Sequence, residues 1–298
     1  MASSVSAGIF ERLFFTYLAI AVIVGGLVIG WLFYAMWRFR ARPDDPRPRD
    51  APVAGMIPAE RGHVLWVYIM AGGIAAIMFG LAFSTISAVD ALENPPKDVP
   101  ASYHNVTGFQ FGWRFNYTGV GGVPFNKVGE FTVPEDTPIV LNVTSQDVWH
   151  NFALPDYRMR VDSIPGVVNP MWFQANDPAE THIACVQLCG AGHAIMRANV
   201  HVLTKADYEA WLARESTVEY ERLANRGTSA NLTLAADGAD LQVSERAKAG
   251  GIALRIVNQD AAARTVAAGG WSVTVQPGET AWLYARLDDA RNVAYEVS

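Results

Sequence analysis

Four side chains that bind soft metal ions lie within twelve positions of this 298-residue chain. The segment holds both cysteines of the protein, one of its six histidines and a methionine, which are Cys185, Cys189, His193 and Met196. Two thiolates, an imidazole and a thioether form a soft ligand set, and sulfur-rich sets of this kind favour copper over metals that prefer oxygen ligands. The segment therefore predicts a copper site, and copper in such a site would move electrons.

The spacing of these residues suits a pair of copper ions that share both thiolates. Both cysteines can turn inward if the three residues between them form a tight loop, and two glycines let the backbone bend on toward His193 and Met196. One more nitrogen ligand is needed, and His150, at the end of a predicted strand, is the best candidate. Other interpretations stay open. Cys185 and Cys189 could form a strained disulfide or bind zinc with the two histidines, and a lone methionine is more often a core residue.

Two long segments without charged residues precede this cluster, Leu13–Trp37 with 25 residues and Val64–Val89 with 26. Each exceeds the roughly 20 apolar residues that cross the hydrocarbon core of a membrane, so both are predicted to be transmembrane helices. A cleaved signal peptide is the alternative for the first segment. Its apolar run is too long for that, and Glu11 beside a single Arg12 is not the basic start of a signal peptide.

The connection between the two apolar segments predicts their orientation. It carries six arginines, namely Arg38, Arg40, Arg42, Arg47, Arg49 and Arg61. Because basic loops stay in the cytoplasm, the N-terminus and everything after residue 89 are expected on the extracytoplasmic side of the plasma membrane. Small residues such as Gly26 and Gly30 can pack the helices against each other or against a larger membrane partner.

Charge is unevenly divided along the chain. Residues 1–89 carry seven arginines and five acidic residues, whereas residues 90–298 carry 16 basic and 24 acidic residues, a net charge of −8. An acidic surface repels the phosphates of nucleic acid and suits a basic protein partner, so no nucleic-acid partner is expected. The alternative is that this charge only keeps an exported domain soluble. The CxxxC spacing also differs from the CxxCH that attaches a c-type haem.

Short alternating strands follow the membrane segments. Examples are Phe109–Phe115, Pro138–Thr144 and Arg197–Leu203, with turn residues about every ten positions, which favours a β-sandwich or barrel. We divide the chain into an external segment (1–12), a first transmembrane helix (13–37), a cytoplasmic loop (38–62), a second transmembrane helix (63–89), a proline-rich linker (90–102), a β-domain (103–204), a linker helix (205–227) and a second small β-domain (228–298).

The chain resembles subunit II of the haem–copper respiratory oxidases, the subunit that carries the copper centre called CuA. Beside the cysteine cluster, the resemblance includes the aromatic segment Gly108–Tyr117, the turn Asp162–Gly166, and Tyr208 with Trp211, and it runs from the apolar helices to about Leu203. It implies a two-helix transmembrane hairpin followed by an all-β cupredoxin-like domain, a Greek-key sandwich or barrel.

The same resemblance implies a ligand set and a function. The implied ligands are Cys185 and Cys189 as bridges, His150 and Met196 on one copper, and His193 with the backbone carbonyl of Gln187 on the other. The chain would accept electrons from cytochrome c or a small copper protein and pass them to haem in subunit I of a proton-translocating cytochrome c oxidase, where oxygen is reduced. No oxygen-reducing site is expected in this chain.

Four positions carry further expectations from the resemblance. Gln187 stands where a glutamate commonly helps to bind magnesium or manganese, and a neutral amide is a weak ligand for such an ion, which argues against a second metal site. Phe111 aligns with the aromatic residue through which electrons enter, and Trp113 is the nearest indole, with packing as the alternative for both. Glu60 is the candidate for proton uptake into subunit I, with an exposed loop acid as the alternative.

Residues 228–298 lie beyond the usual end of that family and resemble a small blue-copper protein, a cupredoxin. The resemblance lies in phrases such as Gly251–Asp260 and Tyr295–Ser298. Arg264 stands where cupredoxins place a ligand histidine and Val297 where they place the ligand cysteine, and the segment contains no His or Cys. We expect a metal-free domain that covers or docks against the face through which electrons enter. A generic β-sandwich is the alternative.

Two other functions compete with the CuA interpretation. A quinol-oxidase subunit II is a structural relative that lacks the copper ligands, whereas all of them are present here. A structural or zinc-binding membrane subunit would have the same helices but transfer no electrons. The spectrum of the copper-loaded protein separates the three.

Overall fold

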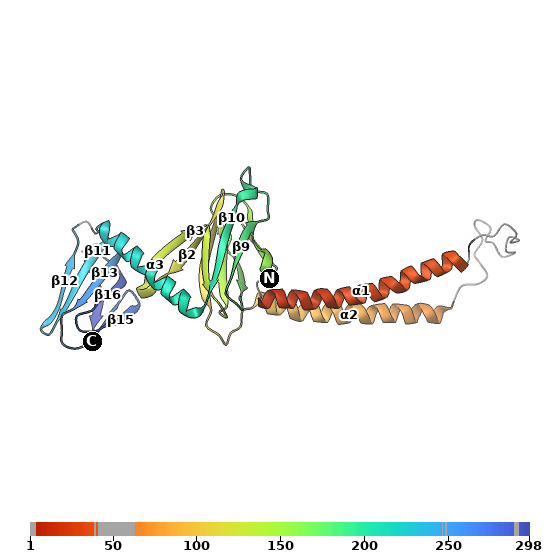
Figure 1. Ribbon diagram of the computed structural model, residues 1–298, viewed down its shortest axis with the longest axis horizontal. Coiled ribbons are helices and arrows are strands. Elements are labelled where there is room, and N and C mark those ends of the chain that lie inside the picture. The colour runs from red at the N-terminus through yellow and green to blue at the C-terminus, as the bar shows by residue number, and fades with distance from the viewer. Residues whose placement is uncertain (1–3, 39, 41–62, 246, 248, 289–291) are drawn as a thin grey trace. The chain divides into compact units, whose positions relative to one another are not determined.

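The computed structural model describes residues 4–38, 40, 63–245, 247, 249–288 and 292–298. The chain forms two compact units, one of them Ser6–Asn94 and the other Pro95–Ser298 together with the start of the chain (Figure 1). Glu60, the candidate for proton uptake, lies outside the described residues.

The first unit contains two long apolar helices, α1 (Val5–Arg38) and α2 (Val64–Glu93), which lie side by side (Figure 1). At 1.5 Å per residue, 34 and 30 residues are each long enough to cross a membrane. The most apolar stretch of each helix is not buried inside the protein, as expected for helices surrounded by lipid or by membrane partners. A hydroxyl contact of 2.6 Å between Tyr17 Oη and Thr85 Oγ1 joins the two helices. The predicted membrane hairpin is confirmed.

The second unit begins with a sandwich of two five-stranded sheets, ordered β3-β2-β1-β5-β8 and β4-β10-β9-β6-β7. The strands are β1 (Ser102–Phe109), β2 (Gly112–Thr118), β3 (Pro124–Val128), β4 (Glu130–Pro134), β5 (Ile139–Ser145), β6 (His150–Leu154), β7 (Met159–Ser163), β8 (Asn169–Phe173), β9 (Ala179–Cys185) and β10 (Arg197–Leu203). Along the strands, every second residue is buried. In β5 this alternation continues over the whole length of the strand. The two layers confirm the predicted all-β sandwich.

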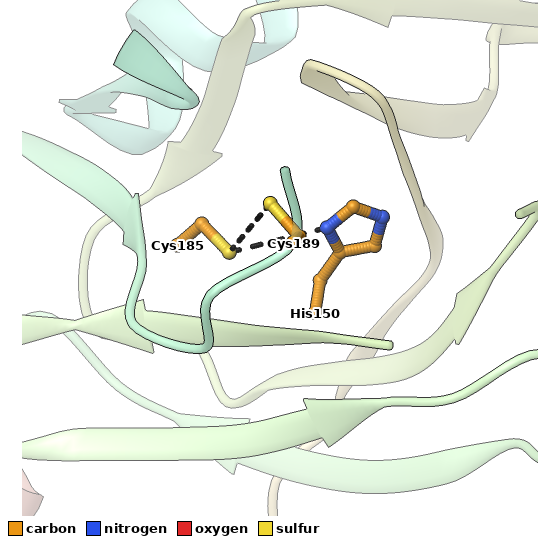
Figure 2. Close-up of side chains that lie close together, drawn as sticks. All are labelled: His150, Cys185 and Cys189. Carbon is orange, nitrogen blue, oxygen red and sulfur yellow. Dashed lines mark hydrogen bonds between the residues drawn. The ribbon is translucent and has the colours of Figure 1, made fainter. Parts of the chain in front are cut away.

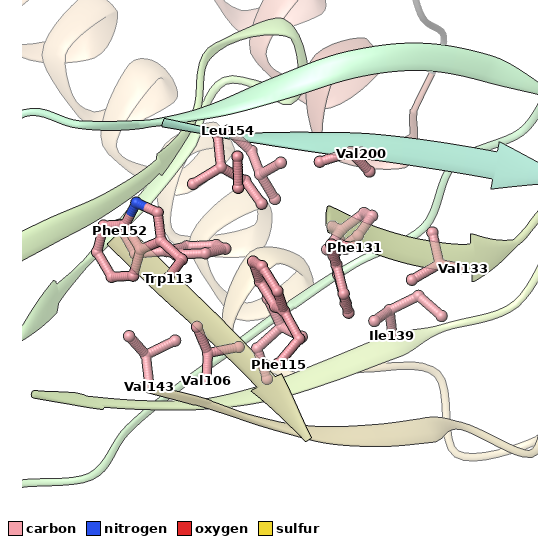
Figure 3. Packing of buried hydrophobic residues seen from close by; sticks show 14 of the residues in the cluster. Val106, Trp113, Phe115, Phe131, Val133, Ile139, Val143, Phe152, Leu154 and Val200 are labelled. Carbon is pink, nitrogen blue, oxygen red and sulfur yellow. The ribbon is translucent and has the colours of Figure 1, made fainter. Parts of the chain in front are cut away.

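Aromatic and branched aliphatic side chains fill the space between the two sheets (Figure 3). Phe115 stacks on Phe131 with ring centroids 4.5 Å apart, and Trp113 meets Phe152 edge-on at 5.0 Å. The same cluster of buried residues continues to both cysteines and to Met196. Three of the predicted metal ligands, both cysteines and Met196, therefore belong to the hydrophobic core, where packed neighbours fix their side chains.

The segment predicted as one strand, Phe109–Phe115, is instead a hairpin. Phe109 pairs with Gly112 across a two-residue turn made of Gln110 and Phe111, which ends β1 and starts β2. Two residues complete one full alternation of side chains, so the apolar pattern continues through the turn and hides it in the sequence. Gly112 is needed here, because a Cβ atom at this position would lie 2.9 Å from the Phe109 ring.

Helix α3 (Lys205–Asn225) follows β10. It begins after Thr204, whose hydroxyl accepts the backbone N–H of Asp207 as an N-terminal cap. Trp211 then packs edge-on against Tyr117 of the first β-domain at 5.2 Å. This contact joins the apolar face of the helix to the core of the first β-domain.

A second, smaller β-domain completes the unit, with sheets ordered β12-β11-β13-β16 and β15-β14-β17. Its strands are β11 (Ser229–Ala235), β12 (Gly238–Val243), β13 (Gly250–Asn258), β14 (Arg264–Ala268), β15 (Trp271–Val275), β16 (Thr280–Leu287) and β17 (Tyr295–Val297). These strands enclose a hydrophobic core of their own.

The second β-domain repeats the strand pairing of the first. β11 pairs with β12 and β13, and β13 with β16, in the same directions as β1 with β2 and β5, and β5 with β8. β14 pairs with β15 and β17 as β6 pairs with β7 and β9. Cys185 lies opposite the residue two positions after His150, and Val297 lies opposite the residue two positions after Arg264. Arg264 and Val297 therefore occupy the positions of His150 and Cys185, as the cupredoxin resemblance implies.

The loop before His150 and the loop before Arg264 also have the same hydrogen bonds, and we call each loop with the residue that follows it a corner. In the first domain Asp147 Oδ1 lies 2.9 Å from His150 Nε2, and in the second Asp260 Oδ2 accepts the Nε–H of Arg264 at 2.6 Å. In both loops the aspartate N–H donates to the side chain two residues earlier, and the aspartate carboxylate accepts the next N–H. The two domains thus share a fold down to the hydrogen bonds of one loop, although one carries ligands and the other an ion pair.

The described contacts between the two β-domains lie around a glycine-rich turn after β2. Val123 of this turn is buried with Tyr220 of α3 and Ala253 of β13, and the Tyr220 hydroxyl donates to the Val120 carbonyl at 3.0 Å. This turn is at the opposite end of β2 from Phe111. The described contacts of the second β-domain with the first therefore lie away from Phe111, the residue proposed for electron entry, and not against it.

Candidate metal centre

Two neighbouring strands and one loop bring the predicted ligands together. His150 is the first residue of β6 and Cys185 the last residue of β9, and these strands are hydrogen-bonded to each other. The other ligands lie on the loop between β9 and β10, where a short helical turn (His193–Ile195) returns the chain to the core. Strands that are fixed by the sheet thus present one ligand each, and the loop presents the rest.

Every predicted ligand lies close to one of two sulfur atoms. Cys185 Sγ is 3.8 Å from Cys189 Sγ and 4.0 Å from His150 Nδ1, as Figure 2 shows. Cys189 Sγ is 3.7 Å from His193 Nδ1 and 3.8 Å from Met196 Sδ. The sixth donor, the carbonyl oxygen of residue 187, is 3.2 Å from Cys185 Sγ. The structure therefore gathers all six donors around the thiol pair.

Burial shields both thiols from water and keeps Cys189 in its neutral form until a metal ion binds. Both cysteines are free and each is 7% exposed, while His150 and Met196 are fully buried. Desolvation, reinforced by the neighbouring Cys185, raises the pKa of Cys189 to about 11. The thiol is therefore protonated at neutral pH, and a metal ion must displace that proton when it binds. Buried thiolates next to imidazole and thioether groups fit a soft metal ion and leave it little contact with water.

Asp147 orients His150 for metal binding. The contact between Asp147 Oδ1 and His150 Nε2 holds the ring proton on Nε2 and leaves the Nδ1 lone pair facing Cys185. Burial raises the pKa of Asp147, but the bonds from His150 and from the backbone N–H groups of Gln110 and Val148 outweigh it and lower the pKa below its ordinary value. Asp147 therefore stays ionised and keeps the ring in one orientation.

The structure separates the two aromatic residues proposed for electron uptake. Phe111 is 37% exposed. Its ring lies so close to the ligand loop that a Cβ atom at Gly192 would be only 2.4 Å from it. Trp113 is fully buried, with its ring centroid 5.9 Å from that of His150. Of these two residues, only Phe111 is therefore exposed on the surface.

Sequence reasoning missed two residues of this centre, Asp147 and Gln110. The Asp147-x-x-His150 spacing could have suggested a carboxylate beside the ligand. Gln110 gave no local signal, because its contact with Cys189 joins residues 79 positions apart through the unrecognised hairpin turn.

Known proteins identify the family of this chain. The family model for the periplasmic domain of cytochrome c oxidase subunit II matches residues 127–203, which include all six predicted ligands. The haem–copper oxidase subunit 2 of Aeropyrum pernix is 34% identical over 67% of this chain and 87% of its own length. The chain belongs to the subunit II family of haem–copper oxidases. Members of this family are electron-transfer subunits of an oxidoreductase complex and bind copper.

Other subunit II proteins are similar over comparable lengths. Cytochrome c oxidase subunit 2 of Alkalihalophilus pseudofirmus is 27% identical over 74% of this chain and 63% of its own length. The corresponding protein of Synechocystis is 26% identical over 75% of this chain and 77% of its own length. Among solved structures, the periplasmic domain of subunit II from Bradyrhizobium japonicum is 30% identical, covering 40% of this chain and 98% of that one with a TM-score of 0.36.

Proposed function

We propose that this subunit II binds a binuclear copper centre of the CuA type and is the electron-accepting subunit of a membrane terminal oxidase. The observation that carries the proposal is the convergence of six donors on one pair of thiols, with sulfur atoms 3.8 Å apart. A single tetrahedral ion such as zinc would be satisfied by the two cysteines and two histidines. Met196 and the carbonyl of Gln187 would then be surplus, whereas two ions that share the thiolates use all six donors.

The chain's own residues provide a rigid, dry and oriented ligand set. A bound copper pair would supply one-electron redox chemistry between an external donor and the haem of subunit I. The strands that carry His150 and Cys185 are paired with each other, and Asp147 fixes the imidazole. Because these groups are packed in the core, they need move little when the charge of the centre changes, which favours fast transfer.

The proposal includes partners and a place in the membrane. We place the N-terminus and both β-domains on the extracytoplasmic side, where cytochrome c or a small copper protein would deliver electrons. Subunit I and other oxidase subunits would surround the helices. Gln187, a half-buried neutral amide, argues against a magnesium or manganese ion bound through this residue. Glu60 is kept as the candidate for proton uptake.

Copper loading of the full-length chain in mild detergent tests the proposal. The thiols are first reduced, and copper content and spectra are then measured. We expect two copper ions per chain, a purple colour and the hyperfine pattern of one electron shared by two copper nuclei. A colourless chain with one zinc ion, or a chain that binds no metal after reduction, contradicts the proposal and favours the zinc-binding or quinol-oxidase alternative.

Phe111→Ala is expected to slow electron uptake without changing the copper spectrum. Exposed aromatic residues at the centre of an interface often contribute most of its affinity, so we expect kcat/KM for cytochrome c to fall about tenfold. The measurement is cytochrome c oxidation by the assembled oxidase. Tyr103→Ala is the matched control, because Tyr103 is 69% exposed near the other end of the same hairpin. Equal rates for the Phe111 variant and the wild type contradict the assignment.

A further inference from the structure

We propose that Gln110 is a positioning residue that holds the ligand loop and the ligand histidine of the metal centre in register with each other. Gln110 lies in the turn between β1 and β2, outside the ligand set, and makes one hydrogen bond to each of the two segments that carry ligands. The inference rests on the proposed copper centre, because it concerns how this chain shapes that centre.

The side chain of Gln110 reaches the ligand loop. Its Nε2–H donates to the backbone carbonyl oxygen of Cys189 at 2.6 Å, which is a short amide–carbonyl hydrogen bond. Cys189 is followed at once by Gly190, whose φ of +135° is a conformation that side chains other than glycine rarely adopt. The bond therefore fixes the carbonyl at the point where the loop turns sharply away from the thiol.

The backbone of Gln110 reaches the other ligand segment. Its N–H donates to Asp147 Oδ2 at 2.7 Å, and Asp147 Oδ1 lies 2.9 Å from His150 Nε2. One residue thus connects the loop of Cys189 to the carboxylate that orients His150. Cys189 and His150 are 39 positions apart in the sequence, so the backbone alone does not hold them close together.

The ligand loop is shaped to receive this turn. A Cβ atom at Gly190 would lie 2.9 Å from Gln110 Nε2, and one at Gly192 would lie 2.4 Å from the Phe111 ring. Any larger residue at either position would push the turn away from the loop. The two glycines therefore permit the close approach that the hydrogen bond of Gln110 needs.

This arrangement has two consequences for a loaded centre. Without the amide donor, the loop that carries Cys189 is held by fewer contacts, so metal is released faster. The amide N–H dipole that points at the backbone carbonyl of Cys189 also places partial positive charge beside a ligand residue, which favours the electron-rich, reduced form of the centre. Removing the donor is therefore expected to lower the midpoint potential.

Three variants of the copper-loaded full-length chain test the inference. Gln110→Glu keeps the shape but replaces the donor by a carboxylate facing the Cys189 carbonyl, and Gln110→Leu removes the polar group. Gln146→Leu is the matched control, because the Gln146 side chain lies next to Asp147 in the sequence but accepts its hydrogen bond from Arg114, at 3.3 Å, instead of bonding to a ligand residue or to Asp147. We expect both Gln110 variants to lose copper to a chelator about tenfold faster than the wild type and to have a lower midpoint potential.

A copper-free measurement keeps the two proposals apart. In the apoprotein, the His193 N–H donates to the Gly190 carbonyl within the loop, and we expect its hydrogen exchange to be faster in both Gln110 variants than in the control. A wild type that binds no copper pair contradicts the proposed function. A wild type that binds the pair, with Gln110 variants unchanged in copper release, potential and exchange, overturns the role of Gln110 alone.

Discussion

Replacing Cys185 with serine is expected to abolish the binuclear centre. A serine hydroxyl is a hard, largely protonated oxygen, and it cannot replace a thiolate shared by two soft ions. In the structure Cys185 Sγ lies 4.0 Å from His150 Nδ1, 3.8 Å from Cys189 Sγ and 3.2 Å from the carbonyl oxygen of Gln187. Its removal should therefore break both halves of the ligand set. We expect the purple colour and the shared-electron signal to disappear, with at most one copper ion left per chain.

Met196→Leu is the comparison for this variant. It removes a donor of one ion only and conserves the volume of a fully buried side chain, so copper should still bind with an altered spectrum. Melting curves of the copper-free proteins show whether either variant has lost its fold. A Cys185→Ser chain that keeps two copper ions and the wild-type spectrum contradicts the bridging role of Cys185.

Trp113→Ala is expected to destabilise the first β-domain by about 3–5 kcal/mol, the usual cost of emptying a large aromatic site in a core. The indole is fully buried between the sheets, edge-on to Phe152 and near His150. Its removal would leave a cavity lined by apolar side chains, which water does not fill favourably. Urea unfolding of the full-length chain in detergent, followed by near-ultraviolet circular dichroism, measures the change.

Phe111→Ala provides the contrast for that experiment. Phe111 is partly exposed on the turn, and its loss should cost less than about 1.5 kcal/mol of stability, since less apolar surface leaves water there on folding. This result would assign Trp113 to the stability of the fold and Phe111 to contact with the electron donor. Equal destabilisation by both substitutions contradicts this division.

The cluster of candidate ligands was recognisable in the sequence because its residues are close together along the chain. Cys185, Cys189, His193 and Met196 lie within twelve positions, and their residue types alone indicate a soft metal. The apolar helices were predictable for a similar reason, since length and lack of charge suffice. His150 was the candidate for the further nitrogen ligand because of its place at the end of a predicted strand, but only the pairing of β6 with β9 shows how it comes to lie beside the cysteines.

The hairpin turn and its contact with the ligand loop were not predictable from the sequence, because both depend on residues that are far apart along the chain. The turn at Gln110 and Phe111 has no Gly-Gly, Asn-Gly or proline signal, and its even length preserves the alternation of side chains. The glycines after Cys189 were understood as flexible points of the loop. In the structure they also make room for a hairpin that is more than 70 residues away in the sequence.

The repeated corner of the second β-domain has a consequence for how the two domains mature. Under the proposed function, the thiols and imidazoles of the first domain would need a metal ion from outside the chain. In the second domain, the guanidinium of Arg264 supplies a permanent positive group to Asp260 from within the chain. The second domain therefore needs no metal ion at this position, and we expect its folding to be independent of the copper supply.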